Sequence, residues 1–98
     1  MIKYHVMRLE WDAAKATQNL KKHGVSFEDA GLVFYDAGRV EAYDGREDYG
    51  EDRWVTIGLV YSAVLYVVYT VRQEDTIRLI SARKADASER KQYRAANA

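Results

Sequence analysis

Three apolar runs in the second half of the chain constrain the fold most strongly. In 53–61 (RWVTIGLVY), every second residue from Val55 to Leu59 is aliphatic, which is the period of a strand with one buried face. In 64–72 (VLYVVYTVR), both alternating sets are apolar or aromatic, which predicts a central strand covered on both sides. A third strand, 76–84 (TIRLISARK), follows a polar turn. Because the connections are short, these strands are predicted to form an antiparallel meander.

Two helices are predicted before these strands. Asp12 can cap the first, which runs to His23, and Gly24 suits the left-handed residue that ends it. Its predicted apolar stripe consists of Ala13, Ala16, Thr17 and Leu20. Ser26 can cap a second helix over residues 27–35, which would bury Phe27, Ala30, Val33 and Phe34.

The ends of the chain complete the predicted order of elements. Asp86 and Glu89 form a capping box for a last helix that reaches about Ala95. A first strand is predicted at 3–11, and at most a short one at 39–43. This order predicts an α+β fold, with two N-terminal helices and a C-terminal helix on one face of a twisted antiparallel sheet of three to five strands.

Length and composition exclude several protein classes. With 98 residues, no proline and no repeat, we expect one domain spanning residues 1–98. The chain has no cysteine, so it offers neither a disulfide framework nor a thiolate metal site. No apolar run approaches the roughly 18 residues of a membrane span, and the N-terminus lacks the apolar core of a signal peptide. We therefore expect a soluble, cytoplasmic protein.

Charge is distributed unevenly along a chain whose formal net charge is zero. Residues 41–52 carry six acidic side chains and one basic, whereas residues 78–94 carry six basic and two acidic. Residues 1–23 carry five basic and two acidic side chains. Two basic ends and an acidic middle are consistent with one basic face on a neutral molecule, or with ordinary solvated surface.

Two motifs, NLKKHGVSF (19–27) and ISAR (80–83), stand out within longer segments. These segments are EWDAAKATQNLKKHGVSFEDA (10–30), GEDRWVTIG (50–58), LYVVYTVR (65–72) and IRLISARKADASERKQY (77–93). Together they resemble the BrnT-type ribonuclease toxins of bacterial type II toxin–antitoxin systems. The pairing of the two motifs is more specific than either motif alone.

The resemblance implies a RelE-like fold and a metal-independent endoribonuclease that cleaves RNA, inhibits translation and needs no cofactor. It also implies a cognate BrnA-type antitoxin and contact with operator DNA only through that antitoxin. A homodimer or a heterotetramer with the antitoxin is then expected. The alternative is a non-catalytic nucleic-acid- or antitoxin-binding module that acts as a transcriptional corepressor.

Metal-free RNA cleavage needs a cation beside the developing charge on the phosphate. If the chain is such a nuclease, Arg83 and Arg53 are the first candidates, because guanidinium groups bind phosphate bidentately and strands can hold them rigidly. Arg72 and Arg78 are less suitable. Contacts to RNA phosphates are predicted for Lys15, Lys22, Arg72, Lys84 and Arg90.

Proton transfer offers several candidates, and they remain open. Histidine is the side chain whose unperturbed pKa lies nearest neutral pH, and of His23 and His5 only His23 lies within a family-like segment. Glu51 is the carboxylate alternative, and Lys22 and Tyr69 are further ones. A structural role for His23 is equally well defined, since a cation in the last turn of a helix stabilises it by roughly 0.3–1 kcal/mol.

Overall fold

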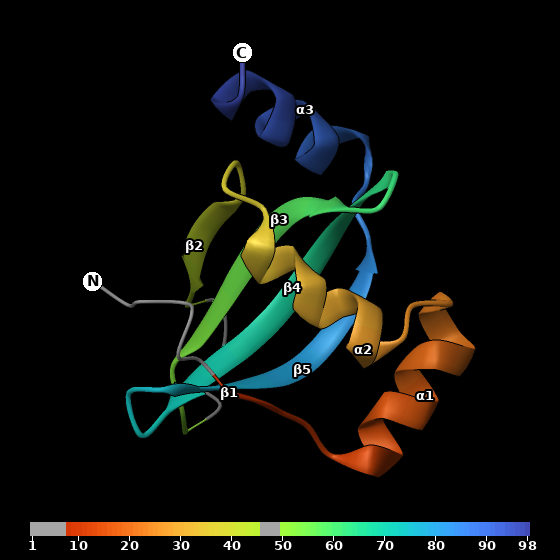
Figure 1. Cartoon of the computed structure of the whole chain (residues 1–98), viewed down its shortest axis with the longest axis vertical. Coiled ribbons are helices and arrows are strands. Elements are labelled where there is room, and N and C mark those ends of the chain that lie inside the picture. The colour runs from red at the N-terminus through yellow and green to blue at the C-terminus, as the bar shows by residue number, and fades with distance from the viewer. Residues whose placement is uncertain (1–7, 46–49) are drawn as a thin grey trace.

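The structure, a computed structural model, describes residues 8–45 and 50–98 (Figure 1). In that part of the chain, the elements are β1 (Arg8–Glu10), α1 (Ala13–His23), α2 (Phe27–Ala30), the 3-10 helix η2 (Gly31–Tyr35), β2 (Val40–Asp44), β3 (Arg53–Val60), β4 (Ala63–Arg72), β5 (Thr76–Lys84) and α3 (Ala87–Ala96). One sheet contains all the strands, in the order β1-β5-β4-β3-β2. Among the described residues, no helix has the length and hydrophobicity needed to cross a membrane.

The predicted meander of β3, β4 and β5 is confirmed, with antiparallel pairing throughout. β4 is central and buried on both faces, as its two apolar sets predicted. Leu65, Val67 and Tyr69 belong to a large core beneath α2 and η2. Val68, on the other face, belongs to a smaller core with Val55 and Ile57. The short strand expected near 39–43 is β2.

β1 corrects the prediction of an entirely antiparallel sheet, because it runs parallel to β5. Arg8 pairs with Thr76 and Glu10 with Arg78 in this register. A short ion pair of 2.8 Å joins Arg78 Nη1 to Glu10 Oε2. A three-residue strand carries no periodic pattern that could reveal its direction, so only its partner on β5 decides it. The remainder of the predicted strand at 3–7 lies outside the described residues.

α3 corrects the prediction that all helices cover one face of the sheet. Its Tyr93 packs against the smaller core of Val55, Ile57 and Val68, on the face opposite α2. The last turn is tied to the loop after η2, where Asn97 Nδ2 donates to Gly38 O at 2.8 Å. Because β4 is apolar on both faces, both faces need a cover, and α3 supplies the second one.

The second predicted helix is divided into α2 and η2. Phe27, Ala30 and Val33 are all fully buried, and their spacing of three residues matches the 3-10 period better than the α-helical one. Gly31 lies at the change of helix type, where a Cβ would stand 2.5 Å from Leu9 Cδ1. Glycine at this position therefore leaves room for the tip of the Leu9 side chain, which is 40% exposed.

The predicted ends of α1 are confirmed, but of its predicted apolar stripe only Ala16 packs against the core. Asp12 caps the first turn, and Gly24 has a φ of 71° with its N–H bonded to Leu20 O. Leu20 itself is 50% exposed, whereas Asn19 is only 7% exposed. The buried face of α1 is therefore centred on a polar residue that the hydrophobic pattern did not identify.

Asp36 joins three parts of the fold through its carboxylate. Leu59 N–H and the Tyr93 hydroxyl each donate to Oδ2 at 2.7 Å, and Gly38 N–H donates to Oδ1 at 2.8 Å. Burial raises the pKa of Asp36, but these hydrogen bonds and the charge of Arg39 outweigh burial and lower the pKa below its usual value. The ionised form is therefore the one that stabilises the fold.

The stability supplied by Asp36 is expected to disappear in acid. A carboxyl with a lowered folded-state pKa contributes its full stability above the unfolded pKa of about 4 and loses it as the pH falls through the folded value. Asp36→Asn should lower the free energy of unfolding by about 1.5–3 kcal/mol at pH 7, because charge-assisted hydrogen bonds are weakened. Urea denaturation at pH 7 and pH 3 measures the effect. An equal deficit at both pH values would contradict it.

Candidate functional site

Asn19 attaches α1 to the uncovered edge of β5. Its Nδ2 donates to Ala82 O at 2.8 Å and to Val25 O at 3.0 Å, and its Oδ1 accepts from Ala82 N–H at 3.1 Å. β1 pairs with β5 only as far as Arg78. Asn19 therefore forms hydrogen bonds with the backbone N–H and C=O of Ala82, where β5 has no neighbouring strand on this edge. This contact joins the motif at 19–27 to the motif at 80–83.

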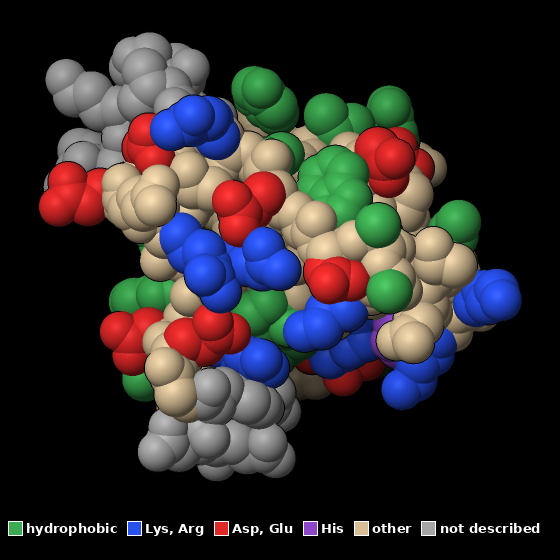
Figure 2. Space-filling view, turned by 90° about the horizontal axis from the view of Figure 1, so that it is seen from below, with side chains coloured by type: hydrophobic (Ala, Val, Ile, Leu, Met, Phe, Trp, Pro, Cys, Tyr) green, Lys and Arg blue, Asp and Glu red, His purple; other side chains and the backbone are tan. Residues whose placement is uncertain are grey.

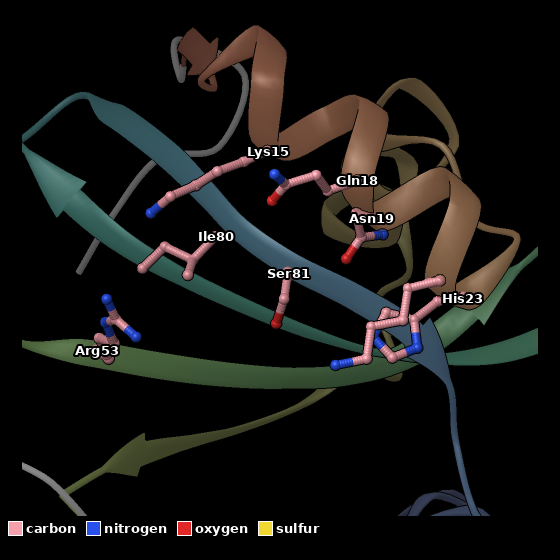
Figure 3. A pocket seen from close by; sticks show the side chains of 8 residues that line it. Lys15, Gln18, Asn19, His23, Arg53, Ile80 and Ser81 are labelled. Carbon is pink, nitrogen blue, oxygen red and sulfur yellow. The ribbon is translucent and has the colours of Figure 1, made fainter.

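A cavity of about 280 Å³ lies between α1 and the sheet, and we call it the α1–β5 groove. Figure 3 shows Lys15 and Arg53 pointing toward each other from α1 and β3, with Ser81 of β5 between α1 and the strands beyond it. The lining residues are Lys15, Gln18, Asn19, Lys22, His23, Arg53, Ile80 and Ser81. The structure thus brings together four of the predicted site residues, which are Lys15, Lys22, His23 and Arg53.

The lysines of the groove differ from its arginine in their ionic surroundings. Within the described part of the chain, neither Lys15 nor Lys22 has an ion-pair partner. Arg53 Nε lies 3.4 Å from Glu51 Oε2, and the other oxygen of Glu51 lies 3.4 Å from Arg72 Nη2. Glu51 therefore bridges two of the predicted site arginines, Arg53 and Arg72, at the end of the groove that Arg53 lines.

Arg83 lies next to the groove but does not line it. Its side chain is on the same sheet face as Ser81, two positions further along β5. Its Nη1 and Nη2 donate to the two oxygens of Glu89 at 2.8 and 2.9 Å, and its guanidinium stacks 4.0 Å from the centre of the Tyr66 ring. The hydrogen bond to Glu89 raises the pKa of Arg83 above its usual value, so its charge is permanent.

The remaining predicted residues lie around this site or away from it. Lys84 is exposed at the end of β5. Arg90 lies on α3, and its Nη1 donates to Ala85 O at 2.8 Å. Tyr69 is only 5% exposed and packs edge-on against Phe34, in the core on the opposite face of the sheet. His5 lies outside the described residues. Figure 2 shows Lys and Arg side chains forming a band across one face of the molecule, interrupted by Asp and Glu.

Several residues of the site were not identified from the sequence. Gln18, Asn19 and Ser81 line the groove, and Glu89 holds Arg83. Asn19 and Ser81 stand inside the two motifs, which was the available signal, whereas Glu89 was interpreted only as a helix cap. Glu89 does cap α3, since its Oε1 also accepts from Asp86 N–H at 2.9 Å. Among the described residues, no group of three His, Asp or Glu side chains could hold a metal ion.

Comparison with known proteins identifies the family of this fold and groove. The model of a family described as the ribonuclease toxin BrnT of type II toxin–antitoxin systems matches residues 11–89. The chain belongs to the BrnT family. No curated protein sequence matches it significantly.

A BrnT crystal structure is similar in fold. The 1.1 Å structure of the Brucella abortus ribonuclease toxin BrnT shares 24% identity with this chain, covers 82% of it and 97% of its own length, and aligns with a TM-score of 0.64. The BrnT match, 11–89, contains every residue of the α1–β5 groove as well as Arg83 and Glu89. Membership of a type II toxin–antitoxin family implies an antitoxin partner.

Proposed function

We propose that this BrnT-family chain is a metal-independent endoribonuclease, a single RelE-like domain over residues 1–98 that cleaves RNA in the cytoplasm and inhibits translation. The observation that supports it most is the α1–β5 groove, where cationic and proton-transferring side chains line one cavity of about 280 Å³. A BrnA-type antitoxin would bind and neutralise the toxin. The toxin would form a homodimer, or a heterotetramer with the antitoxin, and would contact operator DNA only through the antitoxin.

The proposed reaction uses the RNA's own 2′-hydroxyl as nucleophile. His23 takes the proton of that hydroxyl, the 2′-oxygen attacks the adjacent phosphorus, and the bond from phosphorus to the 5′-oxygen breaks. Arg53 and Arg83 stabilise the negative charge that develops on the phosphoryl oxygens. The leaving 5′-oxygen receives a proton from the Lys22 ammonium, while Glu51, a carboxylate paired with Arg53 and Arg72, is the alternative base to His23. The products are a 2′,3′-cyclic phosphate and a free 5′-hydroxyl.

Binding of the flanking RNA is assigned to exposed cations around the groove. Lys15 and Lys22 would contact phosphates within it, and Arg72, Lys84 and Arg90 would contact phosphates beyond it. Because each neutralised phosphate on a single strand releases counterions, log K should fall with log salt by about 0.7 per contact.

His23→Gln tests the proposed base. If His23 transfers a proton, the substitution should slow cleavage on the order of a hundredfold, and the variant should lose an inflection in the pH–rate profile between about pH 5 and 8. The free energy of unfolding should fall by less than about 1 kcal/mol, because only a favourable charge near the end of α1 is lost. Cleavage of a fluorescent oligoribonucleotide across this pH range measures both rate effects.

Lys21→Gln is the matched control for His23→Gln. Lys21 lies in the same last turn of α1 but does not line the groove, so its substitution removes a comparable helix-end charge. Cleavage by Lys21→Gln should equal that of the wild type. Equal rates for His23→Gln and the wild type would show that His23 only ends the helix.

The proposed mechanism is tested directly with a modified substrate. One 2′-deoxy substitution at the cleaved nucleotide should abolish cleavage there, whereas a metal chelator should leave the rate unchanged. Cleavage that survives the 2′-deoxy substitution would exclude attack by the 2′-hydroxyl.

The pairing of Arg53, Arg72 and Arg83 with glutamates gives some support to the alternative, a non-catalytic corepressor, because carboxylates reduce the positive potential on this face. Expression of the chain without antitoxin separates the two functions. Growth arrest that requires His23 and Arg83 supports the nuclease, and absence of arrest supports the corepressor.

A further inference from the structure

A second cavity, of about 310 Å³, lies between the sheet and α3, and we call it the α3-side cavity. Ala42 of β2 and Val55 and Ile57 of β3 form its apolar side, and Gln92 of α3 closes it from the other side. Its volume is at the lower end of the range of small-ligand sites, which suits one small planar group.

The α3-side cavity opens on the same sheet face as the α1–β5 groove. Val68 of β4 pairs with Ser81 of the groove on one side and with Val55 of the cavity on the other. The three side chains form one row across the sheet, because paired residues of neighbouring strands share a face. A chain bound in the groove can therefore continue along this face to the cavity.

Arg83 lies at the boundary between the groove and the cavity. It belongs to the adjacent row of the sheet, in which Arg83, Tyr66 and Ile57 pair across three strands. Tyr66, on which Arg83 stacks at 4.0 Å, lines the cavity, and so does Glu89, which holds Arg83 at 2.8 Å. A phosphate bound to Arg83 would thus have its own nucleoside beside the cavity.

The lining of the cavity distinguishes between the parts of a nucleotide. Asp44 and Glu89 both line it, and two carboxylates disfavour a second phosphate. Val55, Ile57 and Tyr66 line it with apolar atoms, while the Gln92 amide can donate to or accept from the edge of a base. We propose that the α3-side cavity binds one unpaired nucleobase of the RNA whose phosphate contacts Arg83. This proposal rests on the proposed ribonuclease function.

The experiment scans single abasic substitutions along a short RNA that carries 2′-fluoro groups, so that it cannot be cleaved. Wild-type protein should lose affinity about tenfold at one position only, which is the contribution expected from one stacked base. Ala42→Phe should fill the cavity, bind the intact RNA about tenfold more weakly and no longer respond to the abasic substitution. Uniform affinity along the scan, or an Ala42→Phe variant that still responds at that position, would overturn the proposal.

Glu41→Phe is the matched control, because Glu41 is the neighbour of Ala42 on β2 but pairs with Thr56 and faces the other side of the sheet. Its abasic profile should equal that of the wild type. Gln92→Phe fills the same cavity from α3, so the test remains decisive if Ala42→Phe fails to fold. If these variants lose binding to a basic peptide partner and keep their RNA profile, the cavity is a protein-docking site and the proposal is wrong.

The outcomes also separate this proposal from the proposed function. If RNA binding weakens in Lys15→Ala but not in Ala42→Phe or Gln92→Phe, the nucleobase site is excluded and the proposed nuclease function still stands. If the wild-type protein neither binds nor cleaves RNA, both the nucleobase site and the proposed ribonuclease function are excluded.

Discussion

Arg83→Ala is expected to slow RNA cleavage by about two to three orders of magnitude, the usual cost of removing a group that stabilises charge in a transition state. The structure supports this expectation because Glu89 and Tyr66 fix the guanidinium from two directions, at 2.8 and 4.0 Å. The free energy of unfolding should fall by about 1–2 kcal/mol, since the Arg83 and Glu89 side chains are 35% and 14% exposed and Glu89 keeps its hydrogen bond from Asp86 N–H when Arg83 is removed. Single-turnover cleavage and urea denaturation measure the two quantities.

Arg78→Ala is the matched control for Arg83→Ala. Arg78 is also on β5 and also paired with a glutamate, at 2.8 Å, but its partner Glu10 belongs to β1, and neither residue lines the groove. Its loss should leave the cleavage rate within a fewfold of the wild type. A similar loss of activity in both variants, in proportion to lost stability, would show that Arg83 is structural. Arg83→Lys should recover only part of the rate, because an ammonium cannot replace a bidentate fork.

Asn19→Ala is expected to destabilise the fold more than any other single substitution in α1. Removal of the amide leaves the N–H and C=O of Ala82, a residue with no exposed surface, without their partners. Each buried polar group left unsatisfied costs about 1–3 kcal/mol, so we expect a loss of about 3 kcal/mol. For a domain of this size, the melting temperature should fall on the order of 10–20 °C.

Gln18→Ala provides the comparison for Asn19→Ala, because Gln18 is the exposed neighbour on the same helix. It should change the free energy of unfolding by no more than about 0.5 kcal/mol. Asn19→Asp should be nearly as damaging as Asn19→Ala, because a carboxylate would accept from Ala82 N–H but face the carbonyl oxygens of Ala82 and Val25. Melting temperatures of Asn19→Ala and Gln18→Ala within a few degrees of each other would contradict the assigned role.

The role of Asn19 also explains why the two motifs at 19–27 and 80–83 go together in one chain. A helix beside the edge of β5 places Lys15, Lys22 and His23 along one side of the groove, with Ser81 opposite them. The contact between Asn19 and Ala82 sets the distance between these two sides. We therefore expect Asn19 variants that still fold to cleave RNA more slowly, through displacement of α1.

Local sequence determined the elements and their ends. Alternation over 53–61 and the two apolar faces of 64–72 specified the meander and its central strand, because a strand exposes its side chains with a period of two. Asp12, Ser26 and Asp86 fixed the starts of the helices, since a cap needs only its own side chain and a backbone N–H three residues away. The resemblance to BrnT toxins also named four of the eight residues that line the groove, which are Lys15, Lys22, His23 and Arg53.

Only the tertiary structure decided what depends on contacts between segments distant in sequence. The parallel direction of β1 depends on its pairing with β5, and the position of α3 depends on the second apolar face of β4. The burial of Asn19 depends on an edge of β5, 63 residues away, that no neighbouring strand covers. The sequence identifies Glu89 only as a helix cap. Its second role, the pairing of its carboxylate with Arg83, depends on the approach of β5 to α3 in the folded chain. Periodicity and capping are local in the chain, whereas a polar contact across the fold exists only after the sheet has set both partners in place.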